Sequence, residues 1–297
     1  MLKIRRQHTR GLGAYLFIVP ALVAYIYFVF LPTLSTIRYS LYDWNGVSAD
    51  MKFVGVDNYT AMIADPIFWK ALVNNIYWMC GTIGIALVLG LILAVLLLQS
   101  GISEQASAVF RVVYFVPVVL SMIVIGIIWS WIYHPDYGTM NVLLRAVGLQ
   151  TFARPWLGSE TMVMPAIIFV GCWHISGFFM MIFIAGLQGI DPTYYEVGKI
   201  DGASSLRMFF AVTIPLLRNT LTLLVVWAVI WSFKIFDLVY QMTGGGPFHS
   251  SEVIALYMFT NAFRLYETGY ASALAISLAL IITVFSVIYI RAVEKNE

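Results

Sequence analysis

Six apolar stretches, each long enough to cross a lipid bilayer, constrain this chain more than any other feature. A membrane-spanning helix needs about 20 consecutive, mostly apolar residues, because the hydrocarbon core of the bilayer is about 30 Å thick. The six stretches are Ala14–Ile37, Leu72–Leu98, Val109–Tyr133, Met162–Leu187, Leu216–Tyr240 and Ala271–Ile290. Polar segments with Gly, Pro and Asp turn signals separate them. We therefore predict an all-α membrane protein with six transmembrane helices.

The composition agrees with a surface that faces lipid. Of the 297 residues, 61% are hydrophobic and 11% are charged, whereas a soluble domain carries about 25% charged residues. A formal net charge of +2 argues against a nucleic-acid partner. Cys80 and Cys172 both lie inside apolar stretches, so we predict neither a disulfide framework nor a metal-ligand cluster.

The first apolar stretch follows a basic segment, KIRRQHTR, that would also suit the start of a signal peptide. The apolar run is longer than that of a usual signal peptide, and no clear small-x-small cleavage site follows it. We therefore expect this stretch to remain as a true span.

Six spans place both chain termini on one side of the membrane, and the basic residues predict which side. Ten of them fall on the side of the termini: Lys3, Arg5, Arg6, Arg10, Arg111, Lys199, Arg207, Arg218, Arg291 and Lys295. Six fall on the other side: Arg38, Lys52, Lys70, Arg145, Arg154 and Arg264. Because loops rich in Lys and Arg stay in the cytoplasm, we predict that both termini are cytoplasmic.

These spans divide the chain into four predicted parts. They are a cytoplasmic basic N-terminus at residues 1–13, a first transmembrane helix at 14–42, an external segment at 43–71, and a core of five helices at 72–292 that includes a cytoplasmic loop at 188–215.

The cytoplasmic loop between the predicted fourth and fifth spans has the signals of two short helices. Asp191 and Pro192 mark a helix start, and Glu196 suits the positive end of a helix dipole. Gly202 falls where a helix would stop or where the backbone of a partner would come close. Pro215 is expected to reset the chain at the entry to the fifth span. On this pattern alone, an ordinary amphipathic connector on the membrane surface fits equally well.

The sequence of this segment, EVGKIDGASSLRMFFAVTIPLL, resembles the loop motif of binding-protein-dependent ABC importer permeases. That family has Glu-Ala-Ala, then Asp-Gly-Ala, an apolar residue, a spacer and Pro; Val197 and Gly198 stand here in place of the two alanines. Further stretches resemble the carbohydrate branch of the family: FVGVDNYTAMIADPIFWKALVNN (Phe53–Asn75), LVYQMTGGGP from Leu238, and YMFTNAFRLYETGYASALA from Tyr257. The N-terminal part is more similar to the first of the two paired sugar permeases.

This resemblance implies a type I ABC importer transmembrane domain in a bacterial-type cytoplasmic (inner) membrane, which passes a sugar or related polar solute by alternating access. Its partners would be a second homologous permease, two ABC ATPase subunits that hold the ATP and Mg, and an extracytoplasmic solute-binding protein that meets the loops at 43–70 and 243–267. The loop at 188–215 would form a coupling helix that docks in a cleft of an ATPase subunit. The positions that match the family motif are Glu196, Asp201, Gly202, Ala203 and Pro215. Arg207 is included in the coupling loop as the cation expected to bond the partner or the lipid phosphates, and simple positive-inside flanking explains it equally well.

The chain itself lacks the signature of an ATPase. A phosphate-binding loop requires Gly, four residues, then Gly-Lys-Ser/Thr. The Gly198-Lys199 pair has Thr193 in place of the first Gly and Ile200 in place of Ser/Thr. We expect no cofactor in this chain and no enzymatic activity of its own. The alternatives are a stand-alone secondary transporter, which would need mid-span carboxylates, and, less favoured, a membrane-embedded enzyme, which would need a catalytic cluster.

A substrate path is predicted along the fifth span. Trp227, Trp231 and Lys234 follow one another at i, i+4 and i+7 on one helical stripe, and Asp237 comes three residues later. Sugars stack their apolar faces on aromatic rings, and a Lys234–Asp237 pair would offset the cost of charge within a span. Interfacial or helix-packing tryptophans explain the same pattern. In the fourth span, Trp173 lies on a face that is more typical of packing than of a substrate path.

Overall fold

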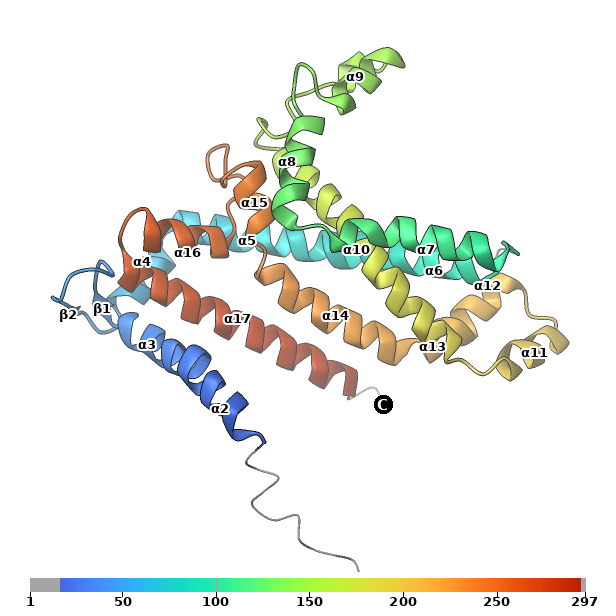
Figure 1. Ribbon diagram of the computed structural model, residues 1–297, viewed down its shortest axis with the longest axis horizontal. Coiled ribbons are helices and arrows are strands. Elements are labelled where there is room, and N and C mark those ends of the chain that lie inside the picture. The colour runs from blue at the N-terminus through green and yellow to red at the C-terminus, as the bar shows by residue number, and fades with distance from the viewer. Residues whose placement is uncertain (1–16, 100, 295–297) are drawn as a thin grey trace, which may run out of the picture. The chain divides into compact units, whose positions relative to one another are not determined.

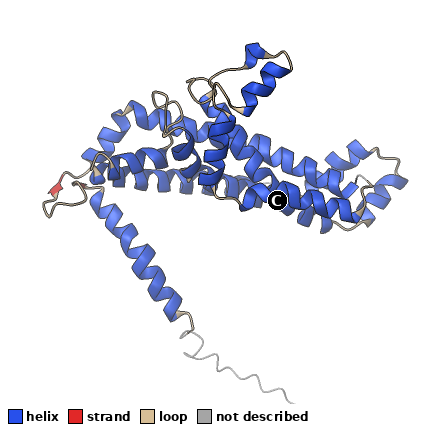
Figure 2. Ribbon diagram, turned by 45° about the horizontal axis from the view of Figure 1, so that its top comes forward, coloured by secondary structure: helices blue, strands red, loops and turns tan. Residues whose placement is uncertain are grey.

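The structure, a computed structural model, describes residues 17–99 and 101–294 and is mostly helical there (Figures 1 and 2). Four of its helices are long and apolar enough to cross a membrane, and two bent helix pairs bring the number to six if each pair is one span. The all-α fold class is thereby confirmed, and the number of predicted spans is matched if each bent pair counts as one span. Residues 1–13, the predicted basic N-terminus, and residues 14–16 of the predicted first span lie outside the described residues.

The described chain groups into two compact units, and the first combines the residues up to Ala64 with Met258–Ser277. Its elements are α2 (Val19–Tyr25), η1 (Ile26–Phe30), α3 (Leu31–Tyr39), β1 (Tyr42–Asp43), β2 (Lys52–Phe53) and α4 (Asp57–Ala64). The first three form one apolar span, Val19–Tyr39, and the side chains of residues 17–34 are all exposed, as expected of a helix that faces lipid or a partner chain. The two strands pair antiparallel. Asn58 on α4 fastens the segment between α3 and β1, because its Nδ2 donates to the carbonyls of Ser40 and Tyr42.

The second unit combines Asp65–Tyr257 with the residues from Leu278 onward and holds the other spans. Its helices before the cytoplasmic loop are α5 (Pro66–Gly81), η2 (Thr82–Ala86), α6 (Leu87–Gln99), α7 (Glu104–Val119), α8 (Met122–Ile132), α9 (Thr139–Ala146), η3 (Gln150–Phe152) and α10 (Val163–Gln188). Those after it are α14 (Arg218–Phe233), α15 (Asp237–Met242), α16 (Ile254–Phe263) and α17 (Thr268–Glu294), and α16 and α17 each have residues in both units. The α5–η2–α6 run is a single span of 33 residues, Pro66–Leu98. It begins at Asp65, whose Oδ1 accepts from the amide of Ile67.

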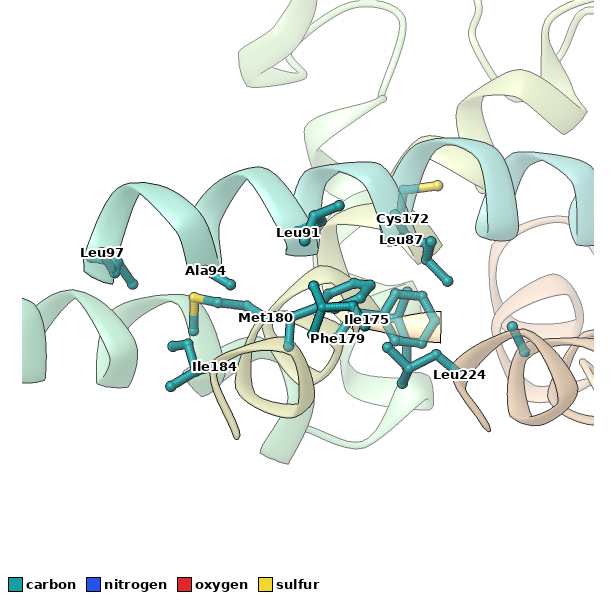
Figure 3. Close-up of a cluster of buried hydrophobic side chains, with 14 residues drawn as sticks. Leu87, Leu91, Ala94, Leu97, Cys172, Ile175, Phe179, Met180, Ile184 and Leu224 are labelled. Carbon is teal, nitrogen blue, oxygen red and sulfur yellow. The ribbon is translucent and has the colours of Figure 1, made fainter. Parts of the chain in front are cut away.

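The core of the second unit lies where α6, α10 and α14 meet (Figure 3). Leu91, Phe179 and Leu224 contribute to it, one from each helix, and all three are buried. Inside a bilayer such helices associate through close van der Waals packing, because lipid tails are as apolar as the side chains. Gly90 makes this possible on α6: a Cβ placed there would stand 2.6 Å from the Cβ of Phe179.

The third predicted span is broken. Residues Val109–Tyr133 were expected to form one helix, but α7 ends at Val119 and α8 starts at Met122, at an angle of 98°. Leu120 and Ser121 between them have extended backbones, with ψ of 143° and 138°. Pro117 lies inside the last turn of α7 and cannot donate an amide hydrogen bond to the carbonyl of Val113, which weakens the helix just before this break.

The fifth predicted span is shorter than expected. It was predicted to run from Leu216 to Tyr240, whereas α14 ends at Phe233 and Lys234 is its C-terminal cap. A new helix, α15, begins at Asp237. The apolar composition continues past Phe233, so the helix end is not visible in the hydropathy of the sequence.

Candidate functional site

The cytoplasmic loop predicted at 188–215 forms two short helices between the fourth span and the fifth (Figure 1). Its elements are α11 (Thr193–Ile200), α12 (Ser205–Met208), η4 (Phe209–Thr213) and α13 (Ile214–Leu216). Asp191 caps the start of α11 as predicted, because its Oδ1 accepts from the amide of Thr193 at 2.9 Å. The backbone and side-chain hydrogen bonds to Thr193 lower the pKa of this fully exposed carboxyl below its usual value.

Gly202 ends α11 in a defined turn. Its φ is +72°, a conformation that favours glycine. Its amide donates to the carbonyl of Lys199 at 3.1 Å, and the amide of Ala203 donates to the carbonyl of Gly198 at 2.9 Å. This pair of bonds is a Schellman motif, which satisfies the last carbonyls of the helix and fixes the direction of the chain that follows. The predicted helix stop at Gly202 is confirmed.

The chain does not change direction at Pro215, contrary to the prediction. The second helix of the loop starts with the Ser204 hydroxyl accepting from the Arg207 amide and continues through Pro215 to Leu216. The bend into α14 comes at Leu217 and measures 66°. The widened π turn of η4 ends at Thr213, two residues before Pro215, and such a turn relieves the clash between a proline ring and the carbonyl four residues earlier.

The two helices of the loop are fastened to each other. The hydroxyl of Tyr195 on α11 lies 3.1 Å from the hydroxyl of Thr213 in η4, and Thr213 is buried. A Cβ at Gly198 would stand 3.3 Å from the Sδ of Met208, so the absence of a side chain there lets α11 approach α12 closely. Neither contact was predicted: Gly198 appeared in the sequence only as a poorer helix former than the alanine of the family motif.

Three charged side chains on the outer surface of the loop have no intramolecular side-chain partner among the described residues. The charged side chains of Glu196, Asp201 and Arg207 are exposed, and within the described residues they take part in no side-chain hydrogen bond or salt bridge. Ile200 is 84% exposed and Leu206 is 70% exposed. Exposed apolar residues beside uncommitted charges, held on a rigid turn, are the composition of a protein-docking surface.

Aromatic rings from α5, α10 and α14 form a cluster in the second unit. Trp227 and Trp231, one turn apart on α14 as predicted, stack with ring centroids 5.7 Å apart and planes at 15°. Phe178 of α10 lies 4.9 Å from Trp227, and the buried Trp78 of α5 lies 5.8 Å from Trp231. Trp227 and Trp231 are both partly exposed. Sequence reasoning placed Phe178 only beside the packing face of the fourth span and did not include Trp78, since only the packing of α5, α10 and α14 brings these two rings to the stripe.

The other predicted substrate residues are not part of this aromatic cluster. Because α14 ends at Phe233, the helical stripe does not reach Lys234 or Asp237, and the prediction of one continuous stripe is wrong there. Lys234 and Asp237 are exposed and no salt bridge joins them. Trp173 is 40% exposed and packs against Trp129 of α8, with centroids 5.6 Å apart.

The fold and the loop define the class of protein: a helical membrane permease with a rigid helical loop between its fourth and fifth spans. The family described as binding-protein-dependent transport system inner membrane component has a model that matches residues 61–295, and this chain belongs to that family. It is therefore the permease component of a binding-protein-dependent transport system, as its resemblance predicted.

Curated relatives and solved structures agree with this assignment. The probable ABC transporter permease protein YurN of Bacillus subtilis is 38% identical over 91% of each chain. The diacetylchitobiose uptake system permease protein NgcF of Streptomyces coelicolor is 34% identical, over 89% of this chain and 77% of the relative. A bacterial ABC transporter that imports alginate contains a chain of the same fold, with a TM-score of 0.83, 18% identity and 95% coverage of both chains. A stand-alone secondary transporter and a membrane-embedded enzyme, the two alternatives, do not describe this family.

Proposed function

We propose that residues 188–215 transmit the movement of two ATPase subunits to the spans of this chain, which imports a sugar or related polar solute together with a second homologous permease. ATP and Mg would be held by the ATPases, and both termini of this chain would lie in the cytoplasm. The membrane would be a bacterial-type cytoplasmic membrane. The rigid attachment of α11 to η4 through Tyr195 and Thr213 is the observation that carries the coupling role.

Rigidity matters because a flexible loop would absorb a displacement that a braced helix passes on. The Schellman turn at Gly202 and the cap at Asp191 fix both ends of α11. The helix after the turn continues to Leu216, at the entry to α14. A push on α11 would thus reach α10 and α14 directly and open the spans outward, the rigid-body route to alternating access.

The coupling role is tested by reversing one charge on the outer surface of the loop. Glu196→Lys should abolish uptake and weaken co-purification of the ATPase subunits, because a carboxylate that bonds a basic group would be replaced by a repelling cation. Glu104→Lys is the matched control, since Glu104 also lies exposed in the first turn of a helix on the same predicted side of the membrane. Both variants should insert normally. Normal uptake by Glu196→Lys would remove the coupling role.

The aromatic cluster is the candidate for the sugar path. The relative NgcF is named for diacetylchitobiose uptake, and the relative SmoG of Agrobacterium fabrum, 32% identical over 87% of this chain and 82% of its own, for sulfoquinovosyl glycerol transport. Rings such as Trp227 and Trp231, which are partly exposed and stacked along one helix, can hold the apolar faces of successive sugar units.

The sugar path is tested with a solute identified first on the cognate binding protein, by a thermal-shift screen of mono- and oligosaccharides. Trp231→Ala should then lower uptake about tenfold or more, the value of a lost stacking contact of about 1.5 kcal/mol, and Trp231→Phe should restore most of it. Trp131→Ala, which removes a tryptophan that is 66% exposed on α8, is the control. Equal effects of Trp231→Ala and Trp131→Ala would argue for packing alone.

The binding protein is proposed to meet the loops at 43–70 and 243–267. In the second unit, the turn after α15 is held firmly for such contact. Asn74 donates to the carbonyl of Glu252 at 2.9 Å, and Lys70 donates to the carbonyl of Phe248 at 2.7 Å. The phenyl ring of Phe248 is 77% exposed at the tip of this turn.

A further inference from the structure

A cavity of about 440 Å³ lies on the inner side of the cytoplasmic loop. The ends of two spans, α6 and α10, form one wall, and α11 with the α12–η4 helix forms the other. Cavities that hold small ligands measure about 300–1,000 Å³. The coupling role places its docking contacts on the outer surface of the loop and uses Tyr195 and Thr213 only to brace α11, so it assigns no ligand to this cavity.

One side of the cavity is suited to an anion. Lys199 supplies the one cation among its lining residues, and no carboxylate lines it. The hydroxyls of Ser205, Tyr195 and Thr213 also line it. In the Tyr195–Thr213 pair, one hydroxyl donates to the other, so the hydrogen of the accepting hydroxyl remains available for an anion. A cation with several hydroxyl donors is a set that binds phosphate oxygens.

The other side of the cavity is apolar. Leu98, Leu187 and Phe209 line it. Leu98 lies in the last turn of α6 and Leu187 in the last turn of α10. These are the points where two apolar spans end, which is the depth of the lipid headgroups. A ligand that fills both sides must therefore carry an anionic head next to an apolar chain.

We propose that this cavity binds an anionic phospholipid, with its phosphate at Lys199, Ser205 and Tyr195 and the start of an acyl chain along Leu98, Leu187 and Phe209. The ligand bridges α11, η4 and the ends of both spans, and so adds a second attachment of the coupling loop beside the Tyr195–Thr213 contact. A zwitterionic headgroup is disfavoured because its cation would meet Lys199.

The test is lipid binding to the purified full-length chain in detergent, followed by native mass spectrometry. Dioleoyl phosphatidylglycerol and dioleoyl phosphatidylcholine are titrated separately. The wild-type chain should bind phosphatidylglycerol at least tenfold more tightly than phosphatidylcholine. Lys199→Gln should lower this affinity about tenfold, the effect of one lost charge-assisted contact, and Lys199→Arg should restore most of it.

Arg207→Gln is the matched control, because it removes the same charge from the same loop. Arg207 lines a different hollow, together with Leu206 and Phe210, and not this cavity. The control should keep its affinity within twofold. A second variant, Leu98→Trp, fills the apolar side without changing charge and should also lower the affinity. Circular dichroism melting of each variant establishes that it is folded.

Three results would overturn the proposal. They are equal binding of the two lipids, equal losses from Lys199→Gln and Arg207→Gln, and displacement of phosphatidylglycerol by millimolar inorganic phosphate with no effect of Leu98→Trp, which would assign the site to a free anion. The measurement needs neither the ATPases nor a transported solute. Its failure would leave the coupling role, which is tested by uptake, unaffected.

Discussion

Two loops of the second unit, one predicted to be external and one predicted to be cytoplasmic, contain nearly the same local structure. Helix α9 (Thr139–Ala146) and helix α11 (Thr193–Ile200) both have eight residues and both start at a threonine. Each ends in a Schellman turn at a glycine: Gly148 has φ of +79°, and Gly202 has φ of +72°. In the external turn, the amide of Leu149 donates to the carbonyl of Leu144 at 2.8 Å, as the amide of Ala203 does to Gly198 in the other.

The two loops differ in what their side chains bind. Asn141 on α9 is buried and holds its own loop together: its Nδ2 donates to the carbonyls of Pro135 and Arg154, and its Oδ1 accepts from the Trp156 indole. Arg145 adds bonds to the carbonyls of Pro135 and Asp136. The cytoplasmic loop has one side-chain link between its helices, Tyr195–Thr213, and leaves its charged outer surface uncommitted. The polar side chains of α9 thus bind within their own loop, whereas Glu196, Asp201 and Arg207 of the loop at 188–215 have no side-chain partner among the described residues.

The largest difference in uptake should appear when the same substitution is made in the glycine turn of each loop. Gly202→Asp and Gly148→Asp both place an L-residue at positive φ in open space, with a local cost of about 1 kcal/mol each. If only the cytoplasmic turn docks on an ATPase, Gly202→Asp should lower uptake about 30-fold or more, as the loss of a central interface position does. Gly148→Asp should change uptake by no more than about twofold.

Uptake into cells that carry the neighbouring transporter subunits measures this, with ATPase co-purification as the second readout. Both variants should insert into the membrane. Similar losses from the two substitutions would mean that backbone strain, and not a partner, explains the effect of Gly202→Asp.

For local stability, the larger loss should come from a substitution in the loop that contains α9, which is the reverse of the order expected for uptake. Asn141→Ala removes several buried hydrogen bonds and should destabilise residues 134–157 by about 2 kcal/mol, which corresponds to about 30-fold faster amide exchange. Tyr195→Phe removes one hydroxyl contact and should cost α11 about 1 kcal/mol, or about fivefold in exchange. Hydrogen–deuterium exchange of the detergent-solubilised chain measures both. A larger loss from Tyr195→Phe than from Asn141→Ala would contradict the contrast between the loops.

The local parts of this structure could be predicted from the sequence. Spans follow from run length, and the cytoplasmic loop follows from Asp191, Gly202 and the family motif, because caps and glycine turns depend on residues close together in the chain. The helix ends inside apolar runs could not be predicted: Lys234 is followed by Ile235 and Phe236, so composition alone does not reveal that α14 stops.

Contacts between residues that are distant in the sequence could not be predicted, for a different reason. The Tyr195–Thr213 contact joins residues 18 apart, and the bonds from Asn141 to Arg154 join residues 13 apart. No periodicity in a single sequence marks such pairs, since they depend on how helices pack. Trp78 joined the aromatic cluster for the same reason, whereas Trp227 and Trp231 were found because they share one helix.

The smallest expected effect comes from the residues that begin each helix. It is a difference between α11 and α9 in how their protection against amide exchange depends on pH. Asp191 caps α11, and its hydrogen bonds to Thr193 lower its folded-state pKa. A carboxyl with a lowered pKa stabilises the fold above its unfolded pKa of about 3.9, and this contribution disappears as the pH falls through the folded value. Protection of α11 against exchange, corrected for intrinsic rates, should therefore fall between pH 5 and pH 3, by less than Asn141→Ala costs the external loop.

Asp191→Asn keeps an oxygen acceptor for the Thr193 amide but cannot titrate, so the pH dependence of α11 should become weaker. Glu196 is present in both proteins, which means that their difference reports Asp191 alone. Helix α9 begins after Gly138, has no side-chain cap and has no acidic residue in its first turn, so its protection should not change over this range. An equal pH response of α9 and α11, or no difference between wild type and Asp191→Asn, would show that the cap does not hold the cytoplasmic helix, and the loop would then depend on Tyr195 and its partners for its rigidity.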